Sequence, residues 1–208
     1  FVDLDFSKAS VQYSNLGGLG PDTGSPQAVR LDNVGDNLDG SPLDMLITNR
    51  SAYTVNNIAL NGVYGAFGQI NVKIGSFVDL TLTFVASGTD DPVTVENVMM
   101  SFYDFDKGAA VAEVLTMGGF ETYTLTADTE IEVRVVADGR TSFGSSVRGF
   151  GSDNPSDPTA LTDLQRRRSV AFTYSSVSSI ELTFESRGQG NGGRNFLFAG
   201  ESFKLGNE

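Results

Sequence analysis

Aspartate and asparagine side chains gather in three short segments, and binding a cation through oxygen atoms is the chemistry that such segments support. They are 32–40 (DNVGDNLDG), 104–108 (DFDKG) and 153–157 (DNPSD). Calcium takes about six to eight oxygen ligands from carboxylates, amide side chains and backbone carbonyls, and each segment offers several of these. None is an EF-hand loop: counted from Asp36, Leu38 falls where an oxygen donor is needed.

The segment 104–108 is the first candidate for a metal site. In an extended strand Asp104 and Asp106 share one face, with Cα atoms about 6.5 to 7 Å apart, while Tyr103 and Phe105 pack inward. Two carboxylates on one face can share a cation, so we expect calcium at Asp104 and Asp106. The competing interpretation is a strand that ends in water, with a turn at Lys107.

The loop 32–40 is the second candidate, with Asp32, Asp36 and Asp39 as the expected calcium ligands. The competing interpretation is a loop of Asx turns. Residues expected to contact a ligand include one aromatic platform and several hydrogen-bonding groups. They are Tyr103, Asp153, Asn154, Asp157, Arg194 and Asn195.

The chain lacks the residue types that several kinds of catalysis require. The chain has no histidine, cysteine or tryptophan, which excludes a serine–histidine triad, a thiol nucleophile and the usual zinc and haem ligands. We therefore expect a protein that is not an enzyme. Carboxylate pairs on one strand face, Glu130 with Glu132 and Glu181 with Glu185, keep glycoside hydrolysis open as an alternative.

Charge and hydropathy exclude some partners. Fourteen basic against 26 acidic side chains give a net charge of −12, which repels nucleic acid and anionic membrane surfaces. No apolar run approaches the length of a membrane span, so we expect no membrane insertion. The chain begins at Phe1, which predicts a processed product or a fragment of a larger protein, and Asn49–Ser51 is a glycosylation sequon; both favour an extracellular location.

Alternation of apolar and polar residues recurs along the chain and predicts an all-β fold, an antiparallel β-sandwich of jelly-roll type with a phenylalanine-rich core. We expect one domain over 1–208 and one short helix near 158–168, capped by Asp157. The predicted strands are 2–6, 10–13, 28–31, 44–48, 52–55, 69–74, 77–84, 93–105, 112–117, 120–125, 129–135, 142–150, 169–174, 179–184 and 194–203.

Two resemblances bear on the same prediction. The segment 98–106 (VMMSFYDFD), followed by 113–115 (EVL), resembles the strand with a terminal Asp-x-Asp found in β-sandwich modules of large cell-surface and adhesive proteins. The segments 148–158 and 193–200 are similar to uncharacterised extracellular proteins of marine algae. The resemblance implies a surface-associated β-sandwich and no particular activity.

The sequence favours a non-catalytic extracellular recognition module that binds carbohydrate or another surface ligand with help from calcium. The first alternative is a structural subunit, whose exposed strand edges pair with copies of itself to build a filament, sheet or coat. The second alternative is a carboxylate-dependent polysaccharide hydrolase or lyase.

Overall fold

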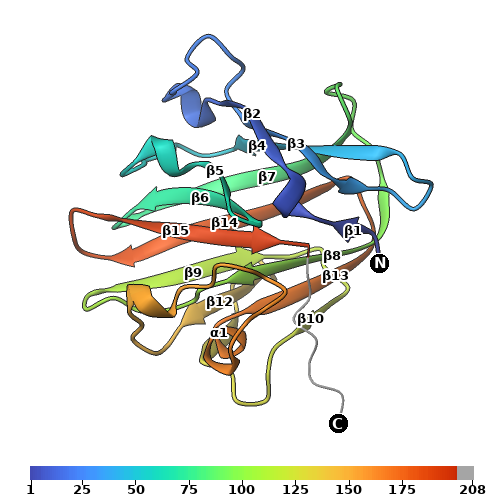
Figure 1. Cartoon of the computed structure of the whole chain (residues 1–208). Coiled ribbons are helices and arrows are strands. Elements are labelled where there is room, and N and C mark those ends of the chain that lie inside the picture. Colours follow the sequence, from blue (N-terminus) through green and yellow to red (C-terminus); the bar gives the residue numbers. More distant parts are fainter. Residues whose placement is uncertain (201–208) are drawn as a thin grey trace.

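Two antiparallel sheets packed face to face make up the computed structural model, which describes residues 1–200 (Figure 1). The first sheet has the order β1 (Asp3–Leu4), β3 (Val29–Asp36), β4 (Pro42–Asn49), β7 (Ser76–Ala86), β14 (Ser179–Gly188), β9 (Val111–Met117), β12 (Thr141–Ser145), β11 (Ile131–Val135), with β2 (Ser10–Ser14) also on β3. The second has the order β10 (Thr122–Thr124), β13 (Val170–Val177), β8 (Val95–Tyr103), β15 (Gly193–Ala199), β6 (Phe67–Lys73), β5 (Gly62–Tyr64). This confirms the predicted all-β sandwich.

Eight strands are arranged as one long hairpin rolled into two layers. In chain order, β6, β7, β8 and β9 pair with β15, β14, β13 and β12, each time antiparallel. Successive pairs alternate between the sheets, so that β6–β15 and β8–β13 lie in the second and β7–β14 and β9–β12 in the first. This is the strand order of a jelly roll, the type of sandwich that the sequence predicts, although it did not predict the order of the strands.

Phenylalanine fills the space between the sheets. The ring of Phe102 packs edge-on against those of Phe172 and Phe184, with centroids 5.8 and 5.9 Å away. The predicted alternation holds in β7, where Val78, Leu80, Leu82 and Phe84 are buried between half-buried polar residues. The fully buried phenylalanines are Phe6, Phe67, Phe84, Phe102, Phe105, Phe143, Phe172, Phe184 and Phe198.

Several strand predictions need correction, among them 142–150, where the strand ends at Ser145. Residues 52–55 form no strand, because the Tyr53 hydroxyl ties this loop to the Asn71 carbonyl of β6 in place of a ladder of backbone bonds. The pattern also missed β5, whose three residues are too few to show alternation. The predicted strand 194–203 ends at Ala199, and residues 201–203 lie outside the described part.

The predicted helix is shorter than expected and begins later. The α-helix α1 spans Asp163–Arg167 and is capped by Thr162, whose hydroxyl accepts from the Gln165 N–H while the Gln165 side chain accepts from the Thr162 N–H. Asp157 does not cap it and instead accepts from the Thr159 N–H. Short 3₁₀ turns are η1 (Phe6–Lys8), η2 (Leu16–Gly18), η3 (Ile58–Leu60) and η4 (Gly151–Asp153). Over residues 1–200, no helix has the length and hydropathy to span a membrane.

Candidate functional site

A group of charged side chains lies at the end of the sandwich where β8 ends and β9, β13 and β15 begin. We call it the charged cluster. It contains four of the predicted site residues, joined by three others that come from different loops and strands. The members are Asp104, Asp106, Asp153 and Arg194, together with Glu113, Glu130 and Arg168.

Two arginines connect the carboxylates of the cluster. Arg168, just after α1, donates from Nε to Glu130 at 2.8 Å, and its Nη1 lies 3.9 Å from Asp106 and 3.6 Å from Asp153. Arg194 on β15 brings Nη1 to 3.5 Å from Asp106 and Nε to 3.8 Å from Glu113. Five carboxylates therefore face two guanidinium groups, which leaves an excess of negative charge when all are ionised.

Asp104 has an unusual backbone. β8 ends at Tyr103, and Asp104 turns the chain with φ of 67°, in the left-handed region. A residue with a Cβ atom is strained there by about 1 to 2 kcal/mol. The predicted geometry, with Asp104 and Asp106 on one face of a continuing strand, is therefore wrong: Asp106 is buried behind the turn, and the partly exposed Asp104 lies at its rim.

The surroundings disfavour ionisation of three carboxyl groups. Burial, followed by repulsion from Asp106, raises the pKa of Asp104 to about 7. Burial also raises the pKa of Asp106, against the attraction of Arg194 and Arg168. The pKa of Glu113 is raised well above its ordinary value by burial and then by Asp104. No residue within 1–200 donates a hydrogen bond to the Asp104 carboxylate.

The Asp106 carboxylate fits only because residue 149 is glycine. A Cβ atom at Gly149 would lie 1.8 Å from Oδ2 of Asp106, far inside van der Waals contact. The Gly149 N–H donates to the Lys107 carbonyl at 3.0 Å, which holds this loop against the turn after β8. The two loops that carry Asp106 and Asp153 are thus packed together at Gly149.

Three other predicted ligand contacts lie outside the cluster. Tyr103 is 2 % exposed and packs its ring against Phe67 at 5.1 Å, so that it belongs to the core rather than to an open platform. Asn195 accepts a hydrogen bond from the Asn71 side chain at 2.7 Å, across β15 and β6. Asn154 is exposed beside η4.

The second predicted calcium loop is spread out. Asp32 accepts from Arg30 Nε at 3.0 Å, Asp36 is exposed at the end of β3, and Asp39 holds the turn by accepting from Ser41. Arg30 also makes a buried ion pair of 2.6 Å with Asp44, which the sequence did not indicate. In the described part of the chain no group of three or more acidic side chains is arranged to hold a metal ion.

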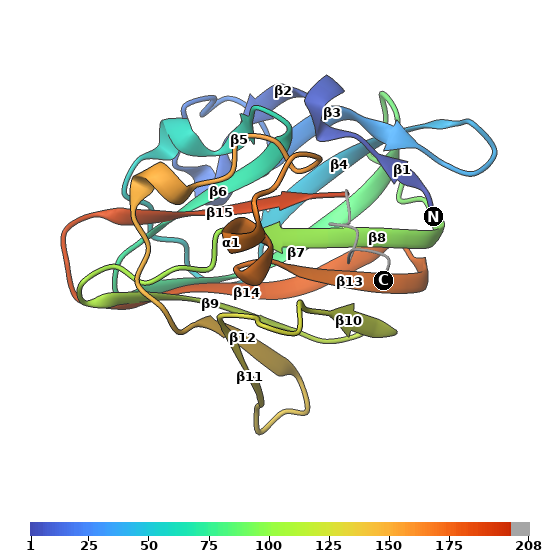
Figure 2. The same cartoon turned by 60° about the horizontal axis from the view of Figure 1, so that its bottom comes forward.

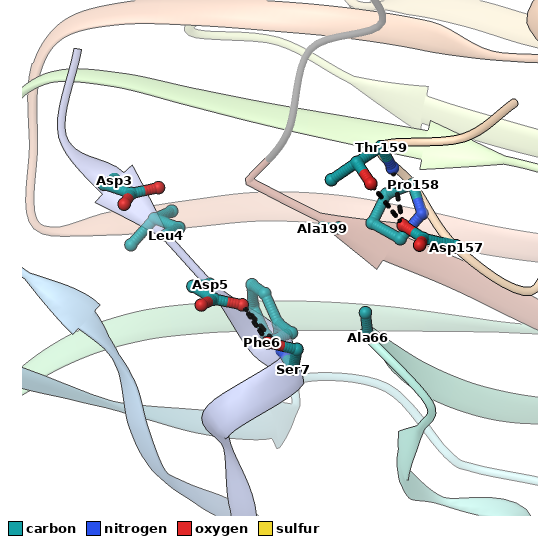
Figure 3. Close-up of a pocket in the computed structure, with 10 residues that line it drawn as sticks. All are labelled: Asp3, Leu4, Asp5, Phe6, Ser7, Ala66, Asp157, Pro158, Thr159 and Ala199. Carbon is teal, nitrogen blue, oxygen red and sulfur yellow. Dashed lines mark hydrogen bonds between the residues drawn. The ribbon is translucent and has the colours of Figure 1, made fainter.

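Asp157 lies in a separate cleft of about 260 Å³. Figure 3 shows Asp3 and Asp5 on one wall and Asp157 with Thr159 on the other. Hydrogen bonds from Ser7 to Asp5 and from Thr159 to Asp157 lower the pKa of both carboxyl groups. The cleft therefore carries negative charge at neutral pH, and two of its carboxylates, Asp5 and Asp157, already accept hydrogen bonds within local turns.

The carboxylate pairs that would serve hydrolysis contact arginines. Glu130 is bound to Arg168 in the charged cluster, and Glu132 accepts from Arg134 at 2.8 Å on the surface. Glu181 lies 3.8 Å from Arg50, and Glu185 accepts from Arg187.

Comparisons with known proteins give one distant likeness. No family model matches the chain, and no curated protein sequence matches it. Among solved structures, the chain is similar to the adhesin domain of PrgB from Enterococcus faecalis, with a TM-score of 0.46 and 11 % identity over 84 % of this chain. The chain covers 63 % of that domain, and a likeness this distant says nothing about a ligand. The resemblance to proteins of marine algae finds no support.

Proposed function

We propose that the chain is a non-catalytic recognition module of a cell surface or extracellular protein, and that it binds carbohydrate or another surface ligand with help from calcium. Asp104 carries this proposal. It combines a left-handed backbone, a raised pKa and a carboxylate without a hydrogen-bond donor within residues 1–200. The strained backbone and the raised pKa are each unfavourable for the fold, and such features concentrate at functional sites.

Calcium is the cation that we expect at Asp104 and Asp106. A divalent cation would stabilise the ionised form of carboxyl groups whose pKa is raised by burial and by one another. Two carboxylates fill only part of the roughly six to eight positions of calcium. Backbone carbonyls, water and the hydroxyl groups of a bound sugar are oxygen ligands of the right kind for the rest, and this is how the metal would assist recognition.

Thermal melts with and without millimolar calcium test the metal half of the proposal. At about a hundred times its Kd, calcium should stabilise the fold by about 2.7 kcal/mol, or about 5 to 10 °C for a chain of this size. Asp104→Asn should abolish this shift, whereas the matched change Asp39→Asn in an exposed turn should retain it. An unchanged melting temperature in the parent chain would refute calcium binding.

A glycan array in calcium and in EDTA tests the recognition half. We expect binding that needs calcium and is lost in Asp104→Asn. Equal binding in calcium and in EDTA would support glycan recognition and refute the role of calcium. If no glycan binds, protein ligands would be tested next.

One observation favours the hydrolase or lyase alternative. A carboxyl group with a pKa of about 7 beside a second carboxylate is suited to general acid catalysis near neutral pH. Release of reducing ends from acidic polysaccharides, lost in Asp104→Asn, would establish this activity in place of simple recognition.

A further inference from the structure

Among residues 1–200, the open edge of β11 is the most regular strand edge without a neighbouring strand. β1 has two residues, β5 and β10 have three each, and the pairing of β2 is broken by a register shift between Val11 and Tyr13. β11 has five residues in unbroken register with β12, and it ends the first sheet. Figure 2 shows the β11–β12 hairpin at the lower margin of the molecule, with β11 outermost.

The backbone groups on this edge point away from the molecule. The Ser146 N–H donates to the Glu130 carbonyl, and the Val136 N–H donates to the Arg140 carbonyl. Because such bonds involve alternate residues in an antiparallel ladder, Glu132 and Arg134 bond to β12. The carbonyls of Ile131, Val133 and Val135, and the N–H groups of the two valines, therefore face the open side.

The side chains of β11 are complementary to a second β11 in antiparallel orientation. A two-fold axis at Val133 places Val133 opposite Val133 of the second copy. The two residues then exchange both backbone hydrogen bonds, which is possible because the N–H and the carbonyl of Val133 face the open side. The same register sets Glu132 opposite Arg134 of the second copy, and Ile131 opposite Val135 of the second copy. Glu132 and Arg134 have 55 % and 70 % exposed side chains, and Val135 is 78 % exposed.

We propose that two copies of this chain pair through β11 and join their first sheets into one continuous sheet. The contact is isologous and closes on itself, so that it yields a dimer and not a filament. The edge lacks a proline, a bulge and an inward-facing charge, three of the features that prevent such pairing, and its two charged side chains, Glu132 and Arg134, are complementary in this register. The charge of −12 on each copy is screened beyond about 8 Å at physiological ionic strength.

Sedimentation equilibrium at physiological salt over a micromolar concentration range tests the dimer and its register. The parent chain should shift from monomer to dimer as concentration rises. Glu132→Arg sets arginine against arginine, and Arg134→Glu sets glutamate against glutamate. Each change should weaken association about tenfold or more, because like charges opposite each other on two strands repel.

A mixture of the two variants is the decisive sample. Glu132→Arg carries two positive charges on β11 and Arg134→Glu carries two negative charges, so the mixed pair should associate where neither variant does alone. Arg50→Glu is the control: Arg50 makes an exposed ion pair, with Glu181 at 3.8 Å, but Glu181 is on β14, which is paired on both sides. It should dimerise like the parent chain.

Three results would overturn the proposal: a parent chain that stays monomeric, dimers unaffected by either β11 variant, or loss of the dimer in Arg50→Glu. None of them depends on calcium or on glycan binding, so failure of the dimer and failure of the proposed function are separate results.

Discussion

Asp104 should make the stability of the fold depend on pH. Its pKa is raised from 3.8 to about 7, so between these values the folded state keeps a proton that the unfolded chain has lost. The free energy of unfolding must therefore fall as the pH rises through this window. In EDTA, we expect Asp104→Asn to remove about 1 to 3 kcal/mol of this fall, since partial exposure screens the full shift.

Urea unfolding at about pH 4 and about pH 8, on the parent chain and on Asp104→Asn, measures the slope. A residual slope in the variant is expected from Asp106 and Glu113, whose pKa values are also raised. Equal slopes in the two proteins would show that the pKa of Asp104 is not raised by folding.

Arg168 should be among the most sensitive positions in the chain. Its side chain is 5 % exposed and lies against the carboxylates of Asp106, Glu130 and Asp153. Arg168→Ala removes the cation that Glu130 and Asp153 contact and leaves only Arg194 beside Asp106. Loss of one partner from a buried ion pair costs about 3 to 5 kcal/mol. The free energy of unfolding in urea measures the loss.

A neighbouring arginine provides the control for this change. Arg166 pairs with Asp163, whose side chain is 89 % exposed, so Arg166→Ala should cost less than about 1 kcal/mol. Similar losses in both variants would mean that the cluster is hydrated and screened like the surface.

The sequence indicated part of the charged cluster and missed the rest. The Asp-x-Asp after β8 and the polar run at 153–157 were visible as local motifs. Glu113 was not singled out, yet it is in phase with the inward-facing Val111, Leu115 and Met117 of β9, and a charge in such a phase signals a buried site. The sequence could not place Arg168 in the cluster, because only the tertiary fold brings its loop to Asp106.

At the scale of elements, Thr162 should determine where α1 begins. Its hydroxyl and the Gln165 side chain satisfy each other's backbone N–H groups at the first turn. Thr162→Ala should lower the free energy of unfolding by about 1 kcal/mol. Asp157→Ala, at the cap position that the sequence predicted, should lower the free energy of unfolding by half of that or less. A larger loss in Asp157→Ala than in Thr162→Ala would support a helix that begins after Asp157.

Strands were predicted well where one face is buried and poorly where neighbours decide the pairing. In β7 and β14, apolar and polar residues alternate along the strand, so the sequence predicts which side chains face the core and which face solvent. Residues 52–55 have a strand-like composition, but the side chain of Tyr53 bonds across to β6 and holds them as a loop. Asp104 ends β8 by a left-handed turn that no alternation pattern can reveal.

At the scale of the molecule, composition was enough for the class of fold but not for the order of strands. The many alternating segments predicted a sandwich and the 15 phenylalanines predicted an aromatic core. The structure has both the sandwich and the aromatic core. The pairing of β6 with β15 joins residues more than a hundred positions apart, which leaves no local trace. That the chain forms one domain over its full length stays a prediction.

The rolled hairpin also determines when each pair of strands can form during folding. β9 and β12 meet at Met117 and Thr141, 24 positions apart (141 minus 117), whereas β6 and β15 meet at Lys73 and Gly193, 120 positions apart (193 minus 73). Loop-closure entropy grows with this separation, and chains rich in distant contacts fold slowly. During synthesis on a ribosome, β6 to β9 emerge before any of their hairpin partners exists. β6 and β7 can then pair only with β5 and β4, and β6 has no β15 beside it until nearly the whole chain is made.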